Sequence, residues 1–182
     1  MPFTFLSCPI QGLVEIQPKV FGDTRGYFLE SWSRREFESA GIRQCFVQDN
    51  QSSSAMGVLR GLHFQKRYPQ GKLVRVIEGR VFDVAVDLRP DSPTFGKWHG
   101  VMLSGERQNM FYVPEGFAHG FLVLSASAIF SYKCTDFYHP EDESGILWND
   151  PDIDIDWPDI GMEYVLSEKD RKLPPFKAME PK

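Results

Sequence analysis

Short segments with the pattern of β-strands follow one another from residue 45 to residue 136 and leave no room for helices between them. Many short strands at such close spacing are typical of antiparallel sandwiches and barrels. Within residues 81–88, Phe82 and Val84 alternate with Asp83 and Asp87, which is the period of a strand with one face on a core. The chain is therefore predicted to be all-β, with strands near 45–52, 57–65, 72–78, 80–88, 97–104, 109–113, 117–124 and 127–136.

Glycine and proline divide the rest of the chain into short elements. Residues 12–32 are expected to hold short strands broken at Pro18 and at the turn cluster 22–26. Residues 78–80, Glu78-Gly79-Arg80, separate two strands so tightly that they predict a hairpin. Residues 66–70 are interpreted as a solvated turn, with a lid over a site as the alternative.

Helices are expected only as a few short peripheral elements. Ser33 and Glu36 have the spacing of a capping box, and Gly41 is a suitable stop for the helix between them. Ser167 and Asp170 bracket a single capped turn. The acidic, proline-rich segment of about 137–182 is otherwise predicted to be a solvated surface segment without the spacing of a calcium-binding loop.

Length and composition limit the classes of protein. A chain of 182 residues with 42% hydrophobic residues favours a single domain over 1–182. The net charge of -5 argues against a general nucleic-acid partner, although a local cationic cluster could still bind a small anion. No apolar stretch is long enough to span a membrane, and the start lacks the pattern of a signal peptide. Together with three scattered cysteines, this predicts a reduced, cytoplasmic protein.

One sequence motif indicates a particular fold. Pro114-Glu115-Gly116-Phe117-Ala118-His119 matches half of the signature of cupins, whose fold is a double-stranded β-helix or jelly roll. Metal-binding cupins also need a His-x-His pair, because several convergent ligands are required to hold a divalent ion. Here residues 63–65 are His63-Phe64-Gln65, with one imidazole where two are needed. The sequence therefore resembles a cupin without a metal.

His63 is the strongest candidate for acid–base chemistry among the four histidines. A lone buried histidine is more often a hydrogen-bonded core residue, but Arg60 and Lys72 close by would be costly cations inside a barrel without an anionic ligand. Lys72 shares its strand face with valines, and Tyr132 is as well explained by a core position as by a cavity. His99 and His139 do not lie in such a cluster of candidate residues and are interpreted as ordinary surface or strand histidines.

The spacing of Arg60 and His63 conflicts with a regular strand. Residues three apart point to opposite faces of a strand, so the two side chains could not share a site. Either Gly61 marks a bulge that re-aims one of them, or Arg60 reaches a ligand from an edge. The sequence leaves both alternatives open.

An ordered set of motifs resembles the dTDP-4-dehydrorhamnose 3,5-epimerase family. The resemblance extends from about Gly12 to Asp170. It is carried by Gln48-Asp49-Asn50, Arg60-Gly61-Leu62-His63-Phe64-Gln65, Lys72, Pro114-Glu115-Gly116-Phe117-Ala118-His119-Gly120-Phe121, Tyr132-Lys133-Cys134-Thr135-Asp136, Leu147-Trp148-Asn149-Asp150-Pro151 and Leu166-Ser167-Glu168-Lys169-Asp170.

The resemblance implies an isomerase that needs neither a cofactor nor a metal. It would invert C3 and C5 of dTDP-4-dehydro-6-deoxy-D-glucose through enolate intermediates, to give dTDP-4-dehydro-L-rhamnose for dTDP-L-rhamnose biosynthesis. His63 would be the base and Asp170 its partner. Tyr132 would be the acid at C5, and Lys72 would stabilise the enolate oxygen. This agrees with the chemistry of a 4-keto sugar, which needs a base, an opposed acid and a cation at the oxygen.

The resemblance also implies substrate contacts and a homodimer. The N-terminal strands of about 12–32 would reach the neighbouring subunit, so that Arg25 and Glu30 serve the partner's site. Phe21, Phe28 and Tyr138 are candidates to pack on the thymine or the sugar, although each aromatic is more often a core residue. The residues at substrate-binding positions are Arg25, Glu30, Gln48, Asn50, Arg60, His119, Glu143 and Lys169.

The sequence allows three alternative functions. A relative that inverts only C3 or only C5 would carry the same residues. A non-catalytic cupin that binds a nucleotide sugar has no need of the opposed His63 and Tyr132, which argues against it. A metal-dependent cupin oxygenase or isomerase would require ligands that the 63–65 motif lacks.

Overall fold

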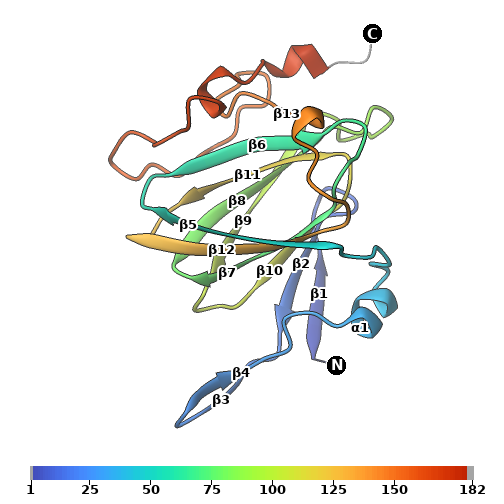
Figure 1. Ribbon diagram of the computed structural model, residues 1–182, viewed down its shortest axis with the longest axis vertical. Helices are drawn as coiled ribbons and strands as arrows, with labels where there is room; N and C mark the ends of the chain where they lie inside the picture. The colour runs from blue at the N-terminus through green and yellow to red at the C-terminus, as the bar shows by residue number, and fades with distance from the viewer. Residues whose placement is uncertain (1, 180–182) are drawn as a thin grey trace.

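Two antiparallel sheets packed face to face make up the body of the protein. The computed structural model describes residues 2–179. Figure 1 shows the sheets one above the other, with the N-terminal elements below them and the C-terminal segment above. The larger sheet has six strands in the order β1 (Phe3–Ser7), β2 (Val14–Pro18), β10 (Met110–Val113), β7 (Lys72–Glu78), β12 (Ser127–Cys134) and β5 (Gln48–Ala55).

The second sheet has five strands, and a separate hairpin extends from the body. The order in the second sheet is β13 (Glu143–Gly145), β6 (Leu59–Gln65), β11 (Phe117–Val123), β8 (Arg80–Asp87) and β9 (Trp98–Ser104). Among the described residues, strands β3 (Phe21–Asp23) and β4 (Gly26–Phe28) pair only with each other, and they stand away from both sheets (Figure 1). The helices are α1 (Arg34–Ser39) and the 3₁₀ turns η1 (Pro140–Asp142), η2 (Asp170–Lys172) and η3 (Phe176–Met179).

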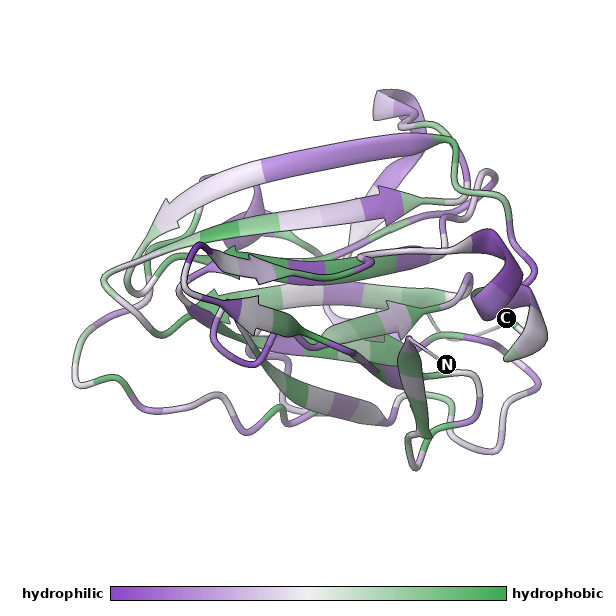
Figure 2. Ribbon diagram, turned by 90° about the horizontal axis from the view of Figure 1, so that it is seen from below, coloured by the Kyte–Doolittle hydropathy of each residue, from purple (hydrophilic) through white to green (hydrophobic). Residues whose placement is uncertain are grey.

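The main core lies between the two sheets. Val74 and Phe130 of the six-stranded sheet pack there against Val81, Ala85 and Phe121 of the five-stranded sheet. In Figure 2 the strands carry most of the hydrophobic segments. The predicted all-β jelly roll with short peripheral helices is thus confirmed, and each strand predicted between residues 45 and 136 is present within three residues at either end. The strands β1 and β13 were not predicted.

The predicted hairpin at residues 78–80 is wrong. Strand β7 belongs to the six-stranded sheet and β8 to the five-stranded sheet, so Gly79 carries the chain from one layer to the other. Gly79 has a φ of 83°, and a Cβ there would collide with the backbone of Ser127 and Ala128. Only glycine fits such a close crossing. Local spacing shows that two strands are consecutive, but it does not show that they pair.

The C-terminal segment covers the outer face of the five-stranded sheet. Asp152, Asp154 and Asp156 are exposed, as expected for a solvated segment. Ile153 and Phe176, however, are buried against outward-facing residues of that sheet, which include Val84, Val86 and Ala118. The expectation that residues 81–88 have a single core face is therefore corrected: both faces of β8 are buried, one between the sheets and one beneath the C-terminal segment.

The two predicted helical caps differ in outcome. Ser33 stands at the N-cap of α1, but its side chain makes no capping hydrogen bond, and the Glu36 side chain pairs with Arg35. Gly41 follows the helix with a φ of 91°, as a helix stop requires. At the second turn, the backbone N–H of Asp170 does donate to Ser167 Oγ at 3.0 Å. Within residues 2–179, no helix is long and apolar enough to cross a bilayer.

Candidate active site

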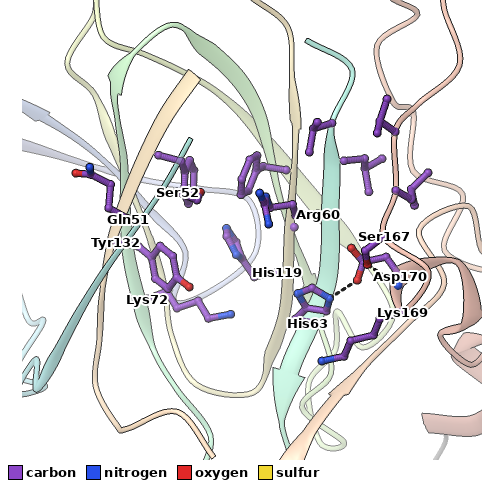
Figure 3. A pocket seen from close by; sticks show the side chains of 17 residues that line it. Gln51, Ser52, Arg60, His63, Lys72, His119, Tyr132, Ser167, Lys169 and Asp170 are labelled. Carbon is purple, nitrogen blue, oxygen red and sulfur yellow. Dashed lines mark hydrogen bonds and ion pairs between the residues drawn. The ribbon is translucent and has the colours of Figure 1, made fainter. Parts of the chain in front are cut away.

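A cavity of about 480 Å³ opens between the two sheets. It is lined by strands of both layers and by the residues just before η2 (Figure 3). A smaller pocket of about 80 Å³ adjoins it and shares His63, Lys72 and Tyr132. The polar residues that line the main cavity are Gln51, Ser52, Arg60, His63, Lys72, His119, Tyr132, Ser167, Lys169 and Asp170.

A bulge in β6 brings Arg60 and His63 to the same cavity. In the pairing of β6 with β11, His63 lies opposite His119 and Arg60 opposite Phe121, so β6 contains one extra residue between the paired positions. Gly61 has a φ of 122°, and a Cβ there would lie 2.5 Å from Gly120 Cα. Of the two alternatives left by the sequence, the Gly61 bulge is confirmed.

His63 is paired with the carboxylate of Asp170. His63 Nε2 lies 2.6 Å from Asp170 Oδ1, and the Asp170 side chain is buried. Burial opposes the charge of Asp170, but hydrogen bonds from His63 and Ser167 outweigh it and hold the pKa of the carboxyl below its usual range. An ionised Asp170 accepts a hydrogen bond from Nε2–H, which leaves Nδ1 of His63 as the basic nitrogen.

The opposite wall of the cavity carries Lys72 and Tyr132. Both residues come from the six-stranded sheet, whereas His63 and His119 come from the five-stranded sheet (Figure 3). Burial lowers the pKa of Lys72 and raises the pKa of Tyr132. A ligand in the cavity would therefore have a histidine on one side and a phenol and an ammonium group on the other.

A second His–Asp pair lies in the same wall as the first. His119 Nε2 is 2.9 Å from Asp83 Oδ1 and 3.0 Å from Asp83 Oδ2, and both side chains are buried. Sequence reasoning missed Asp83, because alternation along β8 explained it as one more polar position. The signal that could have revealed it is a carboxylate in the middle of a strand that is apolar on both faces.

A chain of polar contacts borders the cavity near His63. Lys169 forms an ion pair with Glu143, and Tyr138 Oη donates to Glu143 Oε2 at 2.6 Å. Burial opposes the charge of Glu143, but these two hydrogen bonds and the nearby His63 lower its pKa. The same hydrogen bond to Glu143 raises the pKa of Tyr138 to about 12.

Other predicted binding residues lie near the cavity without forming its wall. Gln48 and Asn50 share the half-buried side of β5 with Ser52, which does line the cavity. Gln48 accepts a hydrogen bond from the backbone N–H of Tyr138, and Asn50 Nδ2 lies 3.6 Å from Cys134 Sγ.

Arg25 and Glu30 lie outside the cavity of their own chain. Arg25 is in the turn of the β3–β4 hairpin, where it pairs with Asp23, and Glu30 is exposed in the segment that follows β4. Phe21 and Phe28 lie on this hairpin and are 51% and 67% exposed. A core position, which is the more frequent one for an aromatic residue, is therefore wrong for both. The hairpin is thus not part of the chain's own hydrophobic core.

Gln65, at the position of a second cupin ligand, has a structural role. Its amide donates to the carbonyl oxygens of Tyr68 and Phe137 and accepts from the N–H of His139. The loop 66–70 is fastened further by Asp142, which accepts from the N–H groups of Arg67 and Tyr68. No group of three or more histidine, cysteine or acidic side chains suited to a metal ion occurs in the described part of the chain.

Fold and site together define an isomerase of the cupin type, with acid–base groups on opposite walls of one cavity. The model of the dTDP-4-dehydrorhamnose 3,5-epimerase family matches residues 7–178. The chain belongs to this family.

Similar proteins agree with this assignment. The dTDP-4-dehydrorhamnose 3,5-epimerase of Methanothermobacter thermautotrophicus is 54% identical, over 96% of this chain and 95% of its own. A Legionella pneumophila 3,5-epimerase in complex with dTDP-4-keto-L-rhamnose is 51% identical, with a TM-score of 0.94 over 99% of this chain and 98% of its own. A 3'-monoepimerase from Streptomyces bikiniensis in complex with dTDP-quinovose is 34% identical, with a TM-score of 0.87 over 93% and 86%.

Proposed function

We propose that the protein inverts C3 and C5 of dTDP-4-dehydro-6-deoxy-D-glucose to give dTDP-4-dehydro-L-rhamnose, as a step of dTDP-L-rhamnose biosynthesis. The observation that carries the proposal is the placement of the paired His63 and Asp170 on one wall of the cavity and of Tyr132 and Lys72 on the other. Inversion at a carbon beside a ketone requires this arrangement, because the proton must leave from one face and return on the other.

His63 acts as the base in this proposal. The C4 keto group makes the hydrogens at C3 and C5 acidic, since loss of either gives an enolate. The ring nitrogen of a neutral imidazole that carries no hydrogen has a lone pair, which can accept such a proton. The Asp170 carboxylate fixes the tautomer of His63 and stabilises the imidazolium that forms.

Lys72 and Tyr132 complete the proton transfer. The Lys72 ammonium group balances the negative charge that develops on the enolate oxygen, and this effect is strong in a half-buried site. Tyr132 keeps its proton at neutral pH, because burial raises its pKa, and it delivers that proton to C5 from the face opposite His63. The reaction needs no electron transfer, in line with an enzyme without a redox cofactor.

The nucleotide part of the substrate is assigned to the polar groups around the cavity. Arg60 lines the cavity, its nearest polar contact is Ser54 Oγ at 3.1 Å, and it forms no ion pair with any residue in the range 2–179. Its guanidinium is therefore available to the diphosphate. Tyr138 is exposed beside the smaller pocket and offers a ring to the thymine. The other substrate contacts are proposed at Gln48, Asn50, His119, Glu143 and Lys169.

The proposed assembly is a homodimer in which the N-terminal region of each subunit completes the site of the other. The β3–β4 hairpin stands away from the body, and Phe21, Tyr27 and Phe28 on it are exposed (Figure 1). Exposed aromatic residues gathered on a projecting element are typical of an interaction site. Arg25 and Glu30 would then contact the substrate of the partner subunit.

We further propose that residues 1–182 act as a single domain in the cytoplasm. The two large sheets in the described residues 2–179 pack around one shared core, and residues 1 and 180–182 lie outside the described part. Cys8, Cys45 and Cys134 are all free thiols, as a reducing compartment favours.

A second candidate is an enzyme that inverts only one of the two carbons. This alternative is supported by the similarity to the Streptomyces bikiniensis 3'-monoepimerase. That protein has the same fold and is named for inversion at a single carbon. The choice depends on how the sugar ring is held between His63 and Tyr132.

Hydrogen exchange in D₂O tests both candidates. The protein is incubated with dTDP-4-dehydro-6-deoxy-D-glucose, and the C3 and C5 protons are followed by NMR. We expect deuterium and inverted configuration at both carbons. Complete exchange with inversion at one carbon alone would establish the narrower activity. Absence of exchange at both carbons would refute the proposed reaction.

A further inference from the structure

The buried pair of Asp83 and His119 has no role in the proton transfer described above. Asp83 lies on β8 and His119 on the neighbouring β11, two positions from the residue that pairs with Asp83. Asp83 has no exposed area, and both of its carboxylate oxygens contact the same nitrogen of His119. A contact through two oxygens to one N–H holds the imidazole ring in a single orientation.

Asp83 acts on the cavity only through its neighbours. His119 and Lys72 both line the cavity, whereas Asp83 does not. A carboxylate with no exposed area is costly unless cationic or hydrogen-bonding partners compensate for the loss of water. Burial raises the pKa of Asp83, and two groups act against this rise: His119, by direct contact, and Lys72, by its charge.

Lys72 is a cation among several ionisable groups. Burial lowers its pKa, and Cys134 of β12, Asp83 of β8 and Glu143 of β13 act in the opposite direction. His63 of β6 and His119 of β11 line the opposite wall of the cavity, and Tyr132 of β12 lies on the same wall as Lys72. Of these groups, Asp83 is the carboxylate without any exposed area, so water screens its charge least.

We propose that Asp83 is a positioning residue that fixes the His119 ring through Nε2 and supplies the negative charge that balances Lys72 at the cavity wall. This inference rests on the proposed epimerase function. With the proton of His119 held on Nε2 by Asp83, Nδ1 is left as a hydrogen-bond acceptor for a hydroxyl group of the sugar. With its charge balanced, the Lys72 ammonium group persists in a half-buried site and meets the enolate oxygen in the protonated form.

The variant Asp83→Asn tests the charge with little change in volume. We expect kcat to fall by at least about tenfold, with KM changed much less, as is typical of a partner that orients an active-site histidine. The alkaline limb of the kcat profile should move to lower pH. The reason is that a nearby carboxylate raises the pKa of an ammonium group, so its removal lets Lys72 lose its proton earlier.

A matched control lies on the same strand. Asp87 is also fully buried on β8, but it pairs with Arg89, Ser92 and Thr94 at the end of the strand and does not line the cavity. Asp87→Asn should lower the unfolding temperature without moving the alkaline limb. If Asp83→Asn leaves the pH profile of a folded, active enzyme unchanged, the inference fails. If wild-type protein shows no epimerase activity in the same assay, the proposed function fails instead.

A measurement on the wild-type protein keeps the inference testable if Asp83→Asn does not fold. Histidine labelled with ¹⁵N reports which ring nitrogen carries the proton, and comparison with His119→Gln assigns the signals among four histidines. We expect the proton of neutral His119 on Nε2. A proton on Nδ1 with a bare Nε2 would overturn the inference, because such a ring cannot donate to Asp83.

Discussion

The proposed roles of His63 and Tyr132 depend on which wall of the cavity each residue lies on. His63 and Tyr132 are not remarkable as an isolated histidine and tyrosine, and the sequence alone left Tyr132 undecided between core and cavity. The structure places them on different sheets that face the same space. In the proposed reaction, this opposition lets one ionisable side chain act as the base and the other as the acid on the two faces of a sugar ring.

Replacement of Tyr132 should separate proton exchange from inversion. In Tyr132→Phe, His63 can still remove a proton and return one from solvent to the same face. We therefore expect deuterium to enter at C5 while inversion at C5 falls by about 10²–10⁴-fold, the typical contribution of a positioned acid. NMR of the sugar in D₂O measures both quantities. His63→Asn is the control and should show neither, and wild-type inversion by Tyr132→Phe would contradict the role given to this residue.

Cavity residues that lie within a recognisable sequence motif could be predicted from the sequence. One residue beside the cavity, Asp83, lies in no motif and was missed. His63, Lys72, Tyr132 and Asp170 belong to recognisable stretches, and the structure brings all four to the cavity. Asp83 has only valines, alanine and phenylalanine around it in the chain. Its importance arises from a contact with His119 on another strand, which local spacing does not contain.

At the scale of the element, the bulge in β6 decides whether the site exists. Without the extra residue at Gly61, Arg60 and His63 would point to opposite faces of the sheet. Strand parity exposed this conflict from the sequence. It could not choose between a bulge and an edge contact, because the choice depends on how close β11 passes to Gly61.

Gly61→Ala should damage both stability and activity. Its Cβ would meet Gly120 Cα at 2.5 Å and His119 O at 2.8 Å, at a φ that only glycine adopts readily. We expect a loss of about 2–4 kcal/mol in the free energy of unfolding, from overpacking and backbone strain together. Urea denaturation measures the stability, and steady-state kinetics measures the activity.

Gly161→Ala provides the comparison for that variant. Gly161 also has a positive φ, of 70°, but a Cβ there would meet no atom within 4 Å. It should cost only the strain of the left-handed conformation, about 1–2 kcal/mol, and should leave kcat unchanged. Equal losses of stability for the two variants, with normal activity in both, would show that the bulge does not depend on the absence of a side chain.

The predictions of individual elements failed where they depended on which other segment a strand or loop packs against. The segments 72–78 and 80–88 were correctly predicted as strands, yet they pair in different sheets. The acidic segment after residue 137 was correctly predicted to be exposed at Asp152, Asp154 and Asp156, but Asp142, Asp150 and Asp170 within it are buried. Its apolar residues Ile153 and Phe176 close the outer face of the five-stranded sheet. In both cases the deciding contact joins residues far apart in sequence, and a local pattern does not include it.

At the scale of the whole molecule, mixed dimers can test whether the hairpin serves the partner subunit. Arg25→Ala and His63→Asn should each be nearly inactive alone. In a mixed dimer, the site that retains His63 would receive an intact Arg25 from the other subunit. Random mixing of the two chains should therefore restore about one quarter of wild-type activity, because half of the dimers are mixed and each has one complete site.

The same experiment can contradict the proposed assembly. If Arg25 served its own subunit, no mixed dimer would contain a complete site, and activity would stay at the level of the single variants. Co-expression of differently tagged chains followed by two-step purification isolates the mixed species. Light scattering of the wild-type protein measures its mass in solution, and a monomeric mass would also argue against the proposal.

The position of Asp170 links catalysis to the order in which the chain is synthesised. Every strand of both sheets precedes Asp170, which lies on a turn that follows the whole sandwich. A growing chain can therefore complete both walls of the cavity, with His63, Lys72 and Tyr132 in place, before the carboxylate that orients His63 has left the ribosome. The segment that leaves the ribosome last thus supplies both the rest of the cavity lining, at Val165, Leu166, Ser167 and Lys169, and the carboxylate that pairs with His63.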